Sequence, residues 1–424
     1  MREIKITLAI CMMAIAIGAS GQSREQLGGI YYAYPDGEAT NLTLPEAPAG
    51  FEPVYISHYG RHGSRWPVNP KAYKIASDFF QEQQIAENLT QEGREVWKMV
   101  TLCAGNANGH LGELTTLGER QHHDIALRMM ANFPQLFKDG GRVEARSSTQ
   151  PRCIMSMAAF TDALRTAKPS LDIRRHATPG DMDFIHHQTE EAELMNSDLA
   201  PWRWDFDPTR DSLAMVQGVI SRLFKNHPDS VAISPEAKIA TIPAFTRALY
   251  DIAISVQNIP GLEADLYSLF TEEELKNLWL ANNYIQYVGN GCSPLTGAIG
   301  PACARPLLKE ISERAEGMLA TGEVPVDLRF GHDTDLLRLV SLMGINSYDV
   351  ETEDIYKAAS EWPNYAIAPM AGNLQLIFYR NDAGEVIFLP LLNENPARIK
   401  GAEMIGGGYY PVSLLKELAE EEAK

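Results

Sequence analysis

The sequence predicts an α/β protein that carries an inserted helical region. Strand-like runs, each followed by a loop and a helix, occur in the first 170 of its 424 residues and return after residue 321. Between them, residues 185–320 favour helices and contain few alternating runs of β-branched residues. We therefore expect residues 22–184 and 321–424 to form one discontinuous α/β domain, and residues 185–320 to form a mainly helical cap.

The first 21 residues have the pattern of a secretory signal peptide. Arg2 and Lys5 supply a basic start, residues 6–17 are apolar, and small residues follow at 18–21. The apolar stretch is short for a membrane span of about 20 residues. We expect the mature protein to be exported to the periplasm or the extracellular space, with no membrane attachment once the signal is removed.

The first α/β segment, after a lead-in at residues 22–50, contains two strand–loop–helix units. The run 54–57 is strand-like and ends in a loop with Gly60 and Gly63, where the backbone must turn tightly. A second strand is expected at 142–146, with residues 147–151 as the loop and helix cap. The helices expected in this segment cover 71–85, 88–104, 115–134 and 152–164.

The cap and the second α/β segment continue the pattern. Helices are expected in the cap at 188–198, 208–227, 243–257, 262–282 and 304–320. A third strand–loop–helix unit follows, with the strand at 324–330 and the helix at 335–343. Two more strands are predicted at 374–380 and 386–391, and the acidic tail at 417–424 is expected to be a frayed helix end.

Charge and cysteine content narrow the function classes. The chain has 37 Lys and Arg against 55 Asp and Glu, a net charge of −18, which argues against nucleic acid or an anionic membrane as the partner. An anionic small molecule is still compatible, because a pocket can concentrate arginines. No cysteine or histidine pairs have zinc-site spacing. In an oxidising compartment we expect Cys292 and Cys303 to form a disulfide, and Cys103 and Cys153 to be buried thiols.

Three strand-to-helix loops carry charged and histidine side chains. In a parallel sheet such loops meet at the carboxyl edge of the strands, where ligands bind. Guanidinium groups match phosphate oxygens bidentately, so this set predicts a site for a tetrahedral dianion. The candidate residues are Arg61, His62 and Arg65 in the first loop, Arg146 in the second, and His332 and Asp333 in the third.

The same residues can carry a two-step phosphoryl transfer. Positive charge around His62 favours its neutral, nucleophilic form, and attack on phosphorus gives a phosphohistidine. The leaving alkoxide needs a proton, which Asp333 can supply if a neighbouring phosphate disfavours its anion.

The run Arg61-His62-Gly63-Ser64-Arg65-Trp66-Pro67 resembles the RHGxRxP signature of the histidine acid phosphatases. His332-Asp333 is similar to the distal HD pair of that family, and Arg146-Ser147-Ser148-Thr149 with Arg152 resembles its intermediate segment. The resemblance implies a mostly parallel sheet of the phosphoglycerate mutase type with a helical cap, and no metal or cofactor. It also implies that His62 is the nucleophile and Asp333 the proton donor. The residues that it assigns to phosphate binding are Arg61, Arg65, Arg146 and His332.

Within that family the chain most resembles the multiple inositol polyphosphate phosphatases and bacterial histidine phytases. The segments that carry this resemblance are 147–153 and 391–394. It implies hydrolysis of phytate and lower inositol phosphates. Many members of that branch carry His-Ala-Glu where this chain has His332-Asp333-Thr334, a pattern closer to general acid phosphatases. We also expect His186 or His187 to reach a second phosphate of the substrate, with a structural pair as the alternative.

Three histidines outside these loops and several alternative functions also have to be considered. His122 and His123 are interpreted as surface residues of a helix, and His58 as a possible support for the first loop. The alternatives to an inositol polyphosphate phosphatase are a phosphatase of broad or sugar-phosphate specificity, a phosphomutase, and an inactive phosphate-binding protein. A binding protein would not need Asp333. We expect a monomer whose partner is a small phosphorylated substrate.

Overall fold

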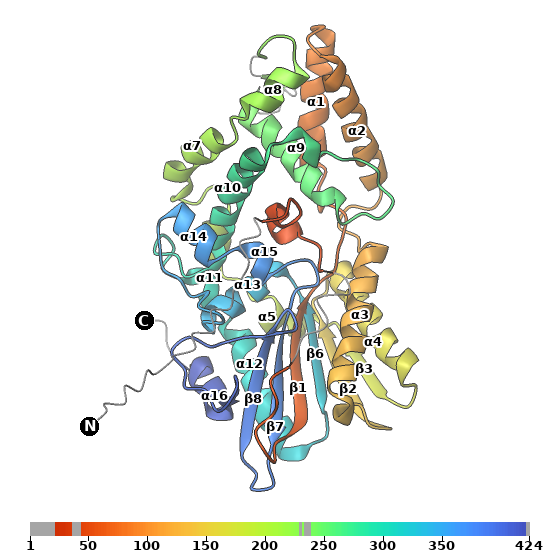
Figure 1. Cartoon of the computed structure of the whole chain (residues 1–424), viewed down its shortest axis with the longest axis vertical. Helices are drawn as coiled ribbons and strands as arrows, with labels where there is room; N and C mark the ends of the chain where they lie inside the picture. Colours follow the sequence, from red (N-terminus) through yellow and green to blue (C-terminus); the bar gives the residue numbers. More distant parts are fainter. Residues whose placement is uncertain (1–21, 36–43, 229–230, 233–238, 421–424) are drawn as a thin grey trace, which may run out of the picture.

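A central mixed β-sheet organises the molecule (Figure 1). The computed structural model describes residues 22–35, 44–228, 231–232 and 239–420; the predicted signal peptide lies outside them. The strand order is β10-β8-β7-β1-β6-β2-β3, with β9 paired to β8. β1, β6, β2 and β3 are mutually parallel, whereas β7 and β10 run antiparallel to their neighbours. The strands are β1 (Glu52–Arg61), β2 (Arg142–Ser147), β3 (Asp172–His176), β6 (Val326–Gly331), β7 (Asn373–Arg380), β8 (Val386–Leu392), β9 (Asn395–Pro396) and β10 (Tyr410–Pro411).

Helices cover both faces of this sheet. One face packs against α3 (Thr116–Asn132) and α4 (Pro151–Ala167), and Ile56 of β1 and Leu328 of β6 point to that side. The alternate residues of the strands point to the opposite face, as the two-residue period of a strand requires. That opposite face is covered by α5 (Met182–Ile185), α12 (Arg305–Thr321), α13 (Asp333–Leu342) and α16 (Val412–Glu420). The predicted α/β class is confirmed.

A helical region lies beyond the carboxyl edge of the parallel strands (Figure 1). Its hydrophobic core joins α1 (Lys71–Ile85) and α2 (Gln91–Ala107) to α8 (Gln217–Leu223), α9 (Ile242–Val256) and α10 (Glu272–Asn290). The remaining elements are η1 (Gln26–Tyr31), α6 (Glu190–Asn196), α7 (Arg203–Leu213), α11 (Ile299–Ala302), α14 (Ile355–Glu361), α15 (Asn364–Ile367), and a two-stranded ribbon of β4 (Val231–Ala232) and β5 (Ile239–Ala240).

The structure divides the chain differently from the expected boundaries. α1 and α2 fall within 22–184, yet their apolar residues, such as Phe79 and Val96, pack with α8 and α9. α12 falls almost wholly within 185–320, yet Leu308 and Ile311 pack on the sheet. The helical region beyond the carboxyl edge is therefore built from two separate stretches of sequence, one with α1 and α2 and one with α8 to α10.

The cysteines do not form the expected disulfide. All four described cysteines are free thiols. The Cys292 sulfur lies 3.9 Å from the Ser341 carbonyl oxygen, and the Cys303 sulfur lies 3.9 Å from the Thr189 hydroxyl. The loop between the two cysteines folds into α11, which turns each thiol toward a different neighbour.

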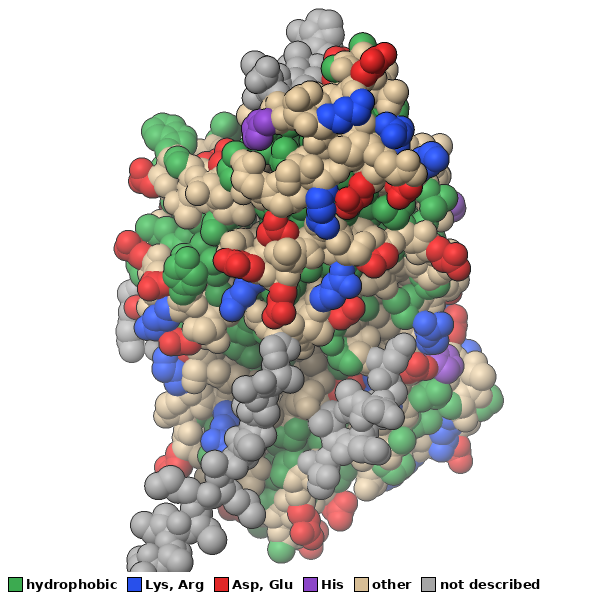
Figure 2. Space-filling model, turned by 45° about the horizontal axis from the view of Figure 1, so that its top comes forward, with side chains coloured by type: hydrophobic (Ala, Val, Ile, Leu, Met, Phe, Trp, Pro, Cys, Tyr) green, Lys and Arg blue, Asp and Glu red, His purple; other side chains and the backbone are tan. Residues whose placement is uncertain are grey.

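The surface drawn in Figure 2 mixes both signs of charge, and the described helices are not of the membrane-spanning kind. On the face drawn in Figure 2, acidic and basic side chains are interspersed, so the excess of acidic residues makes no single-sign field there. Among the described residues, no helix combines the length and the apolar character that a membrane span needs.

Candidate active site

The loop after β1 is held by β6 and by the segment that leads into β7. The His62 amide donates to the Gly331 carbonyl of β6 at 3.0 Å, and the Ala371 amide donates to the His62 carbonyl at 3.0 Å. Parallel pairing of β1 with β6 brings the ends of both strands together, since Arg61 lies opposite Gly331. The first and third predicted loops therefore meet, as the sequence analysis expected.

Gly63 is needed because another backbone passes close to it. A Cβ atom at Gly63 would lie 2.5 Å from the Gly118 carbonyl oxygen, and one at Gly118 would lie 2.3 Å from the Ser64 carbonyl. The first turn of α3 thus packs directly on the loop. The Gly63 amide donates to the Ser156 hydroxyl of α4 at 3.1 Å, which anchors the loop from a second helix.

His62 is buried and oriented by its own loop. Its Nδ1 lies 2.9 Å from the Gly63 carbonyl oxygen, which can only accept, so Nδ1 carries the proton and Nε2 is left with a lone pair. Burial lowers the pKa of His62 well below its usual value, and the charges of Arg61 and Arg65 lower it further. The imidazole is therefore neutral in mildly acidic solution.

Three arginines lie around His62, from the end of β1, the loop that follows it and α4. Arg61 ends β1, Arg65 follows four residues later, and Arg152 is the second residue of α4. Arg61 donates to the Ile30 and Ala368 carbonyls through Nη1, while Arg65 donates to the Trp66 carbonyl at 3.0 Å. The buried Nε atoms of all three arginines have no hydrogen-bond partner among the described residues. Buried donors of this kind are costly unless a ligand satisfies them.

Asp333 begins α13 and faces the arginines. Its carboxylate lies 3.4 Å from Arg61 Nη2, and its side chain is 16% exposed. Burial alone would raise the pKa of Asp333, but the positive charges of Arg61 and Arg65 outweigh burial and lower it to about 2. In the substrate-free site Asp333 is thus an anion.

His332 completes the group. Its Nδ1 lies 3.3 Å from Arg152 Nη2, which can only donate, so its proton resides on Nε2, 3.2 Å from the Ser148 hydroxyl. The rings of His332 and His62 have centroids 5.9 Å apart. Burial lowers the pKa of His332 to about 4, with Arg152 and His186 adding to the effect.

Arg146 does not join this group, which corrects the sequence expectation. It lies on β2 with Glu144, on the face of the sheet that α12 covers. Its guanidinium donates to Asp327 at 2.8 Å and to Glu144 at 2.9 Å, within an ion-pair network that also holds Arg314 and Arg329. Arg152, six residues later, stands where Arg146 was expected.

The remaining histidines divide between core and site edge. His186 and His187 are both half-buried, but only His186 is seen beside the site, with its ring centroid 4.5 Å from that of His332. His122 is buried, not exposed as expected, because its side of α3 faces Phe330 of β6. His123 is exposed and contacts Asp124. His58 is buried against Phe160 and Phe330.

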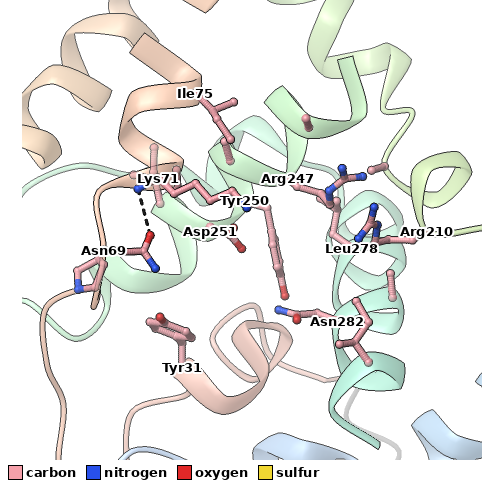
Figure 3. Close-up of a pocket in the computed structure, with 18 of the residues that line it drawn as sticks. Tyr31, Asn69, Lys71, Ile75, Arg210, Arg247, Tyr250, Asp251, Leu278 and Asn282 are labelled. Atoms are coloured by element: carbon pink, nitrogen blue, oxygen red, sulfur yellow. Dashed lines mark hydrogen bonds between the residues drawn. The ribbon is translucent and has the colours of Figure 1, made fainter. Parts of the chain in front are cut away.

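A cavity of about 770 Å³ lies in the helical region, between α1, α7, α9 and α10. Tyr31 of η1 lies at its floor and Tyr250 points down into it, while Arg210 and Arg247 lie along one wall (Figure 3). Neither His62 nor Asp333 lines it. Tyr31 connects the two regions, because its ring packs against the Arg65 guanidinium, with 5.2 Å between the guanidinium carbon and the ring centroid.

Comparison with known proteins gives one family. Residues 60–388 match the model of the histidine phosphatase superfamily (branch 2). Multiple inositol polyphosphate phosphatase 1 from Gallus gallus is 24% identical over 420 residues, covering 92% of this chain and 89% of the relative. The Homo sapiens protein of the same name is also 24% identical, covering 88% and 81%.

Solved structures show the same fold. Multiple inositol polyphosphate phosphatase from Bifidobacterium longum, in complex with inositol hexasulfate, matches with a TM-score of 0.78 at 16% identity, over 94% of this chain and 98% of that one. The phytase from D. castellii matches with a TM-score of 0.66 at 14% identity, over 93% and 84%.

Proposed function

Because the chain belongs to branch 2 of the histidine phosphatase superfamily, we propose that it is a phosphomonoesterase that hydrolyses inositol polyphosphates. The curated relatives are named for this activity, and a solved protein of the same fold binds inositol hexasulfate, in which sulfates replace the phosphates of phytate. We propose His62 as the nucleophile and Asp333 as the proton donor.

The phosphate to be removed binds between the arginines. Arg61, Arg65 and Arg152 offer guanidinium edges to its oxygens. The Nε2 proton of His332, which the Ser148 hydroxyl accepts in the substrate-free site, becomes a further donor when a phosphate oxygen replaces that acceptor. Arg152 takes the place that the sequence analysis gave to Arg146. The single observation that carries the proposal is this set of unpaired buried donors around a neutral imidazole whose Nε2 lone pair is free.

In the first step, Nε2 of His62 attacks phosphorus. The bond from phosphorus to the ester oxygen breaks, and Asp333 transfers a proton to that oxygen, so that an alcohol leaves and a phosphohistidine remains. In the second step water attacks the phosphohistidine, and the Asp333 carboxylate takes a proton from the water. Inorganic phosphate leaves and His62 is again neutral.

The test is hydrolysis of inositol hexakisphosphate beside p-nitrophenyl phosphate, in buffer with EDTA. We expect release of inorganic phosphate from both. His62→Ala lowers kcat by roughly 10⁴-fold or more, because the covalent intermediate cannot form. His123→Asn is the matched control, since this exposed histidine contacts Asp124 outside the site and should leave the rates unchanged.

The outcomes separate the candidate functions. Full activity of His62→Ala would remove the proposed nucleophile. Hydrolysis of p-nitrophenyl phosphate with little release from the inositol substrate would favour the alternative, a phosphatase of broad or sugar-phosphate specificity. Phosphate binding without turnover would favour an inactive binding protein.

A further inference from the structure

A carboxylate–imidazole pair lies just outside the group around His62. His186 directly follows α5, and Asp335 is the third residue of α13. The Nδ1 of His186 lies 2.8 Å from the Asp335 carboxylate, with side-chain exposures of 29% and 6%. The carboxylate can only accept, so Nδ1 carries a proton and Nε2 is directed away from Asp335.

The position of this pair relative to the site is fixed by a shared hydroxyl. The Tyr59 hydroxyl donates to the Ile185 carbonyl at 3.2 Å and accepts from the His332 amide at 3.1 Å. The ring of His186 therefore stands beside that of His332, which in turn stands beside that of His62. His332 is thus the neighbour that His62 and His186 share.

Charges around His186 favour its cationic form. Burial lowers the pKa of His186, but the hydrogen bond and the charge of Asp335 outweigh burial and raise it above its ordinary value. Asp333, from the same helix, acts in the same direction, while Arg338 and His332 oppose it. Arg338 is engaged elsewhere, because it donates to Asn290 and Gln188 at 3.0 Å each.

We propose that His186, held by Asp335, is a specificity-determining residue that binds a second phosphate of the substrate next to the one being removed. This inference rests on the proposed function and selects His186 over His187, for which no ion pair occurs among the described residues. A second phosphate accepts the Nε2 proton of the imidazolium in a charge-assisted hydrogen bond. A simple monoester, such as p-nitrophenyl phosphate, offers no such group.

The pair also sets the pH range of the preference. An imidazolium binds the second phosphate, whereas a neutral ring with its proton on Nδ1 presents only a lone pair to it. The preference for a polyphosphorylated substrate should therefore be strong in acid and weaken as the pH rises through the titration of His186.

The experiment measures kcat/KM for inositol hexakisphosphate and for p-nitrophenyl phosphate from pH 4.5 to 8. For each protein and pH, kcat/KM for inositol hexakisphosphate is divided by kcat/KM for p-nitrophenyl phosphate, and this ratio measures the preference. The preference of the natural protein divided by that of a variant gives a quotient from which the titration of the substrates themselves cancels. For His186→Asn we expect this quotient to be about tenfold or more at pH 5 and to approach one at high pH. Asp335→Asn keeps an acceptor for Nδ1 but removes the negative charge, which lowers the pKa of His186. The variant should therefore lose its preference for the inositol substrate at a lower pH than the natural protein does, and its quotient should rise above one in that range.

Two further measurements keep the test decisive. His123→Asn should give a quotient of one throughout, and thermal unfolding checks that Asp335→Asn is folded. NMR of histidine ring carbons should show His186 titrating above the ordinary value of about 6.5, a signal that is absent in His186→Asn and shifted to lower pH in Asp335→Asn. A quotient near one at pH 5 for His186→Asn overturns the inference, as does a titration of His186 at or below 6.5. Absence of turnover with both substrates in the natural protein overturns the proposed function instead.

Discussion

At the residue scale, burial and the arginines together set the charge states in which the two proposed reacting groups start. Burial keeps His62 neutral and the charges of Arg61 and Arg65 add to it, whereas the sequence predicts the neutral form from the charges alone. They also keep Asp333 ionised, with a pKa of about 2, although the acid role requires a proton there. A bound phosphate neutralises the arginines and raises that pKa. Asp333 therefore takes up the proton for the leaving group when the substrate binds.

This role of Asp333 predicts a dependence on the leaving group. Asp333→Asn should slow esters of alkyl alcohols by roughly 10²-fold or more, because their alkoxides need a proton to depart. Nitrophenolate departs without one, so kcat for p-nitrophenyl phosphate should fall far less. Steady-state rates with the two kinds of ester test this, and equal slowing of both would exclude Asp333 as the acid.

At the element scale, the period of β2 explains why Arg146 is not at the site and Arg152 is. One face of β2 carries residues 142, 144 and 146, and the other carries the buried Val143 and Ala145. On the first face, Asp327 of the neighbouring strand β6 is the partner of Arg146. The alternation and Glu144 are visible in the sequence, but the second partner, Asp327, comes from a distant segment. Pro151 begins α4 and sets Arg152 in its first turn, at the carboxyl edge of the sheet.

A pair of variants separates these two arginines. Arg152→Ala should lower kcat/KM by roughly 10²-fold, since a donor to the transferred phosphoryl group is lost, with little change in stability. Arg146→Ala should lower the free energy of unfolding by about 1–3 kcal/mol, since Asp327 and Glu144 lose a buried donor, with kcat/KM nearly unchanged. Urea unfolding and steady-state kinetics measure both. The reverse pattern would restore Arg146 to the site.

The elements that sequence reasoning placed well are those with a strong pattern. The predicted helix at 71–85 agrees with α1 at both ends. The five strands predicted from the sequence lie within or overlap β1, β2, β6, β7 and β8. The helix expected at 262–282 was misplaced, because the capping box from Thr271 to Glu274 starts α10 at Glu272, ten residues later. β3 was missed, because this mostly exposed edge strand has a single apolar residue, Ile173.

At the scale of the whole molecule, acid stability depends on two histidines in the centre of the fold. His58 on β1 and His122 on α3 both contact Phe330, and burial lowers the pKa of each to about 3. The unfolded chain takes up these protons below about pH 6.5, well before the folded chain does. The stability that they contribute is therefore complete above pH 6.5 and is lost as the pH falls toward 3.

We predict that the free energy of unfolding falls by about 1.4 kcal/mol per pH unit for each of these histidines between pH 6.5 and 3. Urea unfolding at pH 7, 6, 5 and 4 measures the slope. His122→Leu removes one titrating group, so its slope should be shallower by that amount, whatever its stability at pH 7. An unchanged slope would show that His122 is protonated in the folded protein.

The pairing of β1 with β6 has a consequence for how the protein is made. The two strands that lead into His62 and His332 are neighbours in the sheet, yet the chain between them runs from residue 62 to residue 325. Contacts so distant in sequence must wait until a large loop closes, which makes folding slow. A ribosome that has synthesised only the first three-quarters of the chain has made the nucleophile but none of the strand beside it. The nascent protein therefore stays incomplete, and without its phosphate site, until the last quarter emerges.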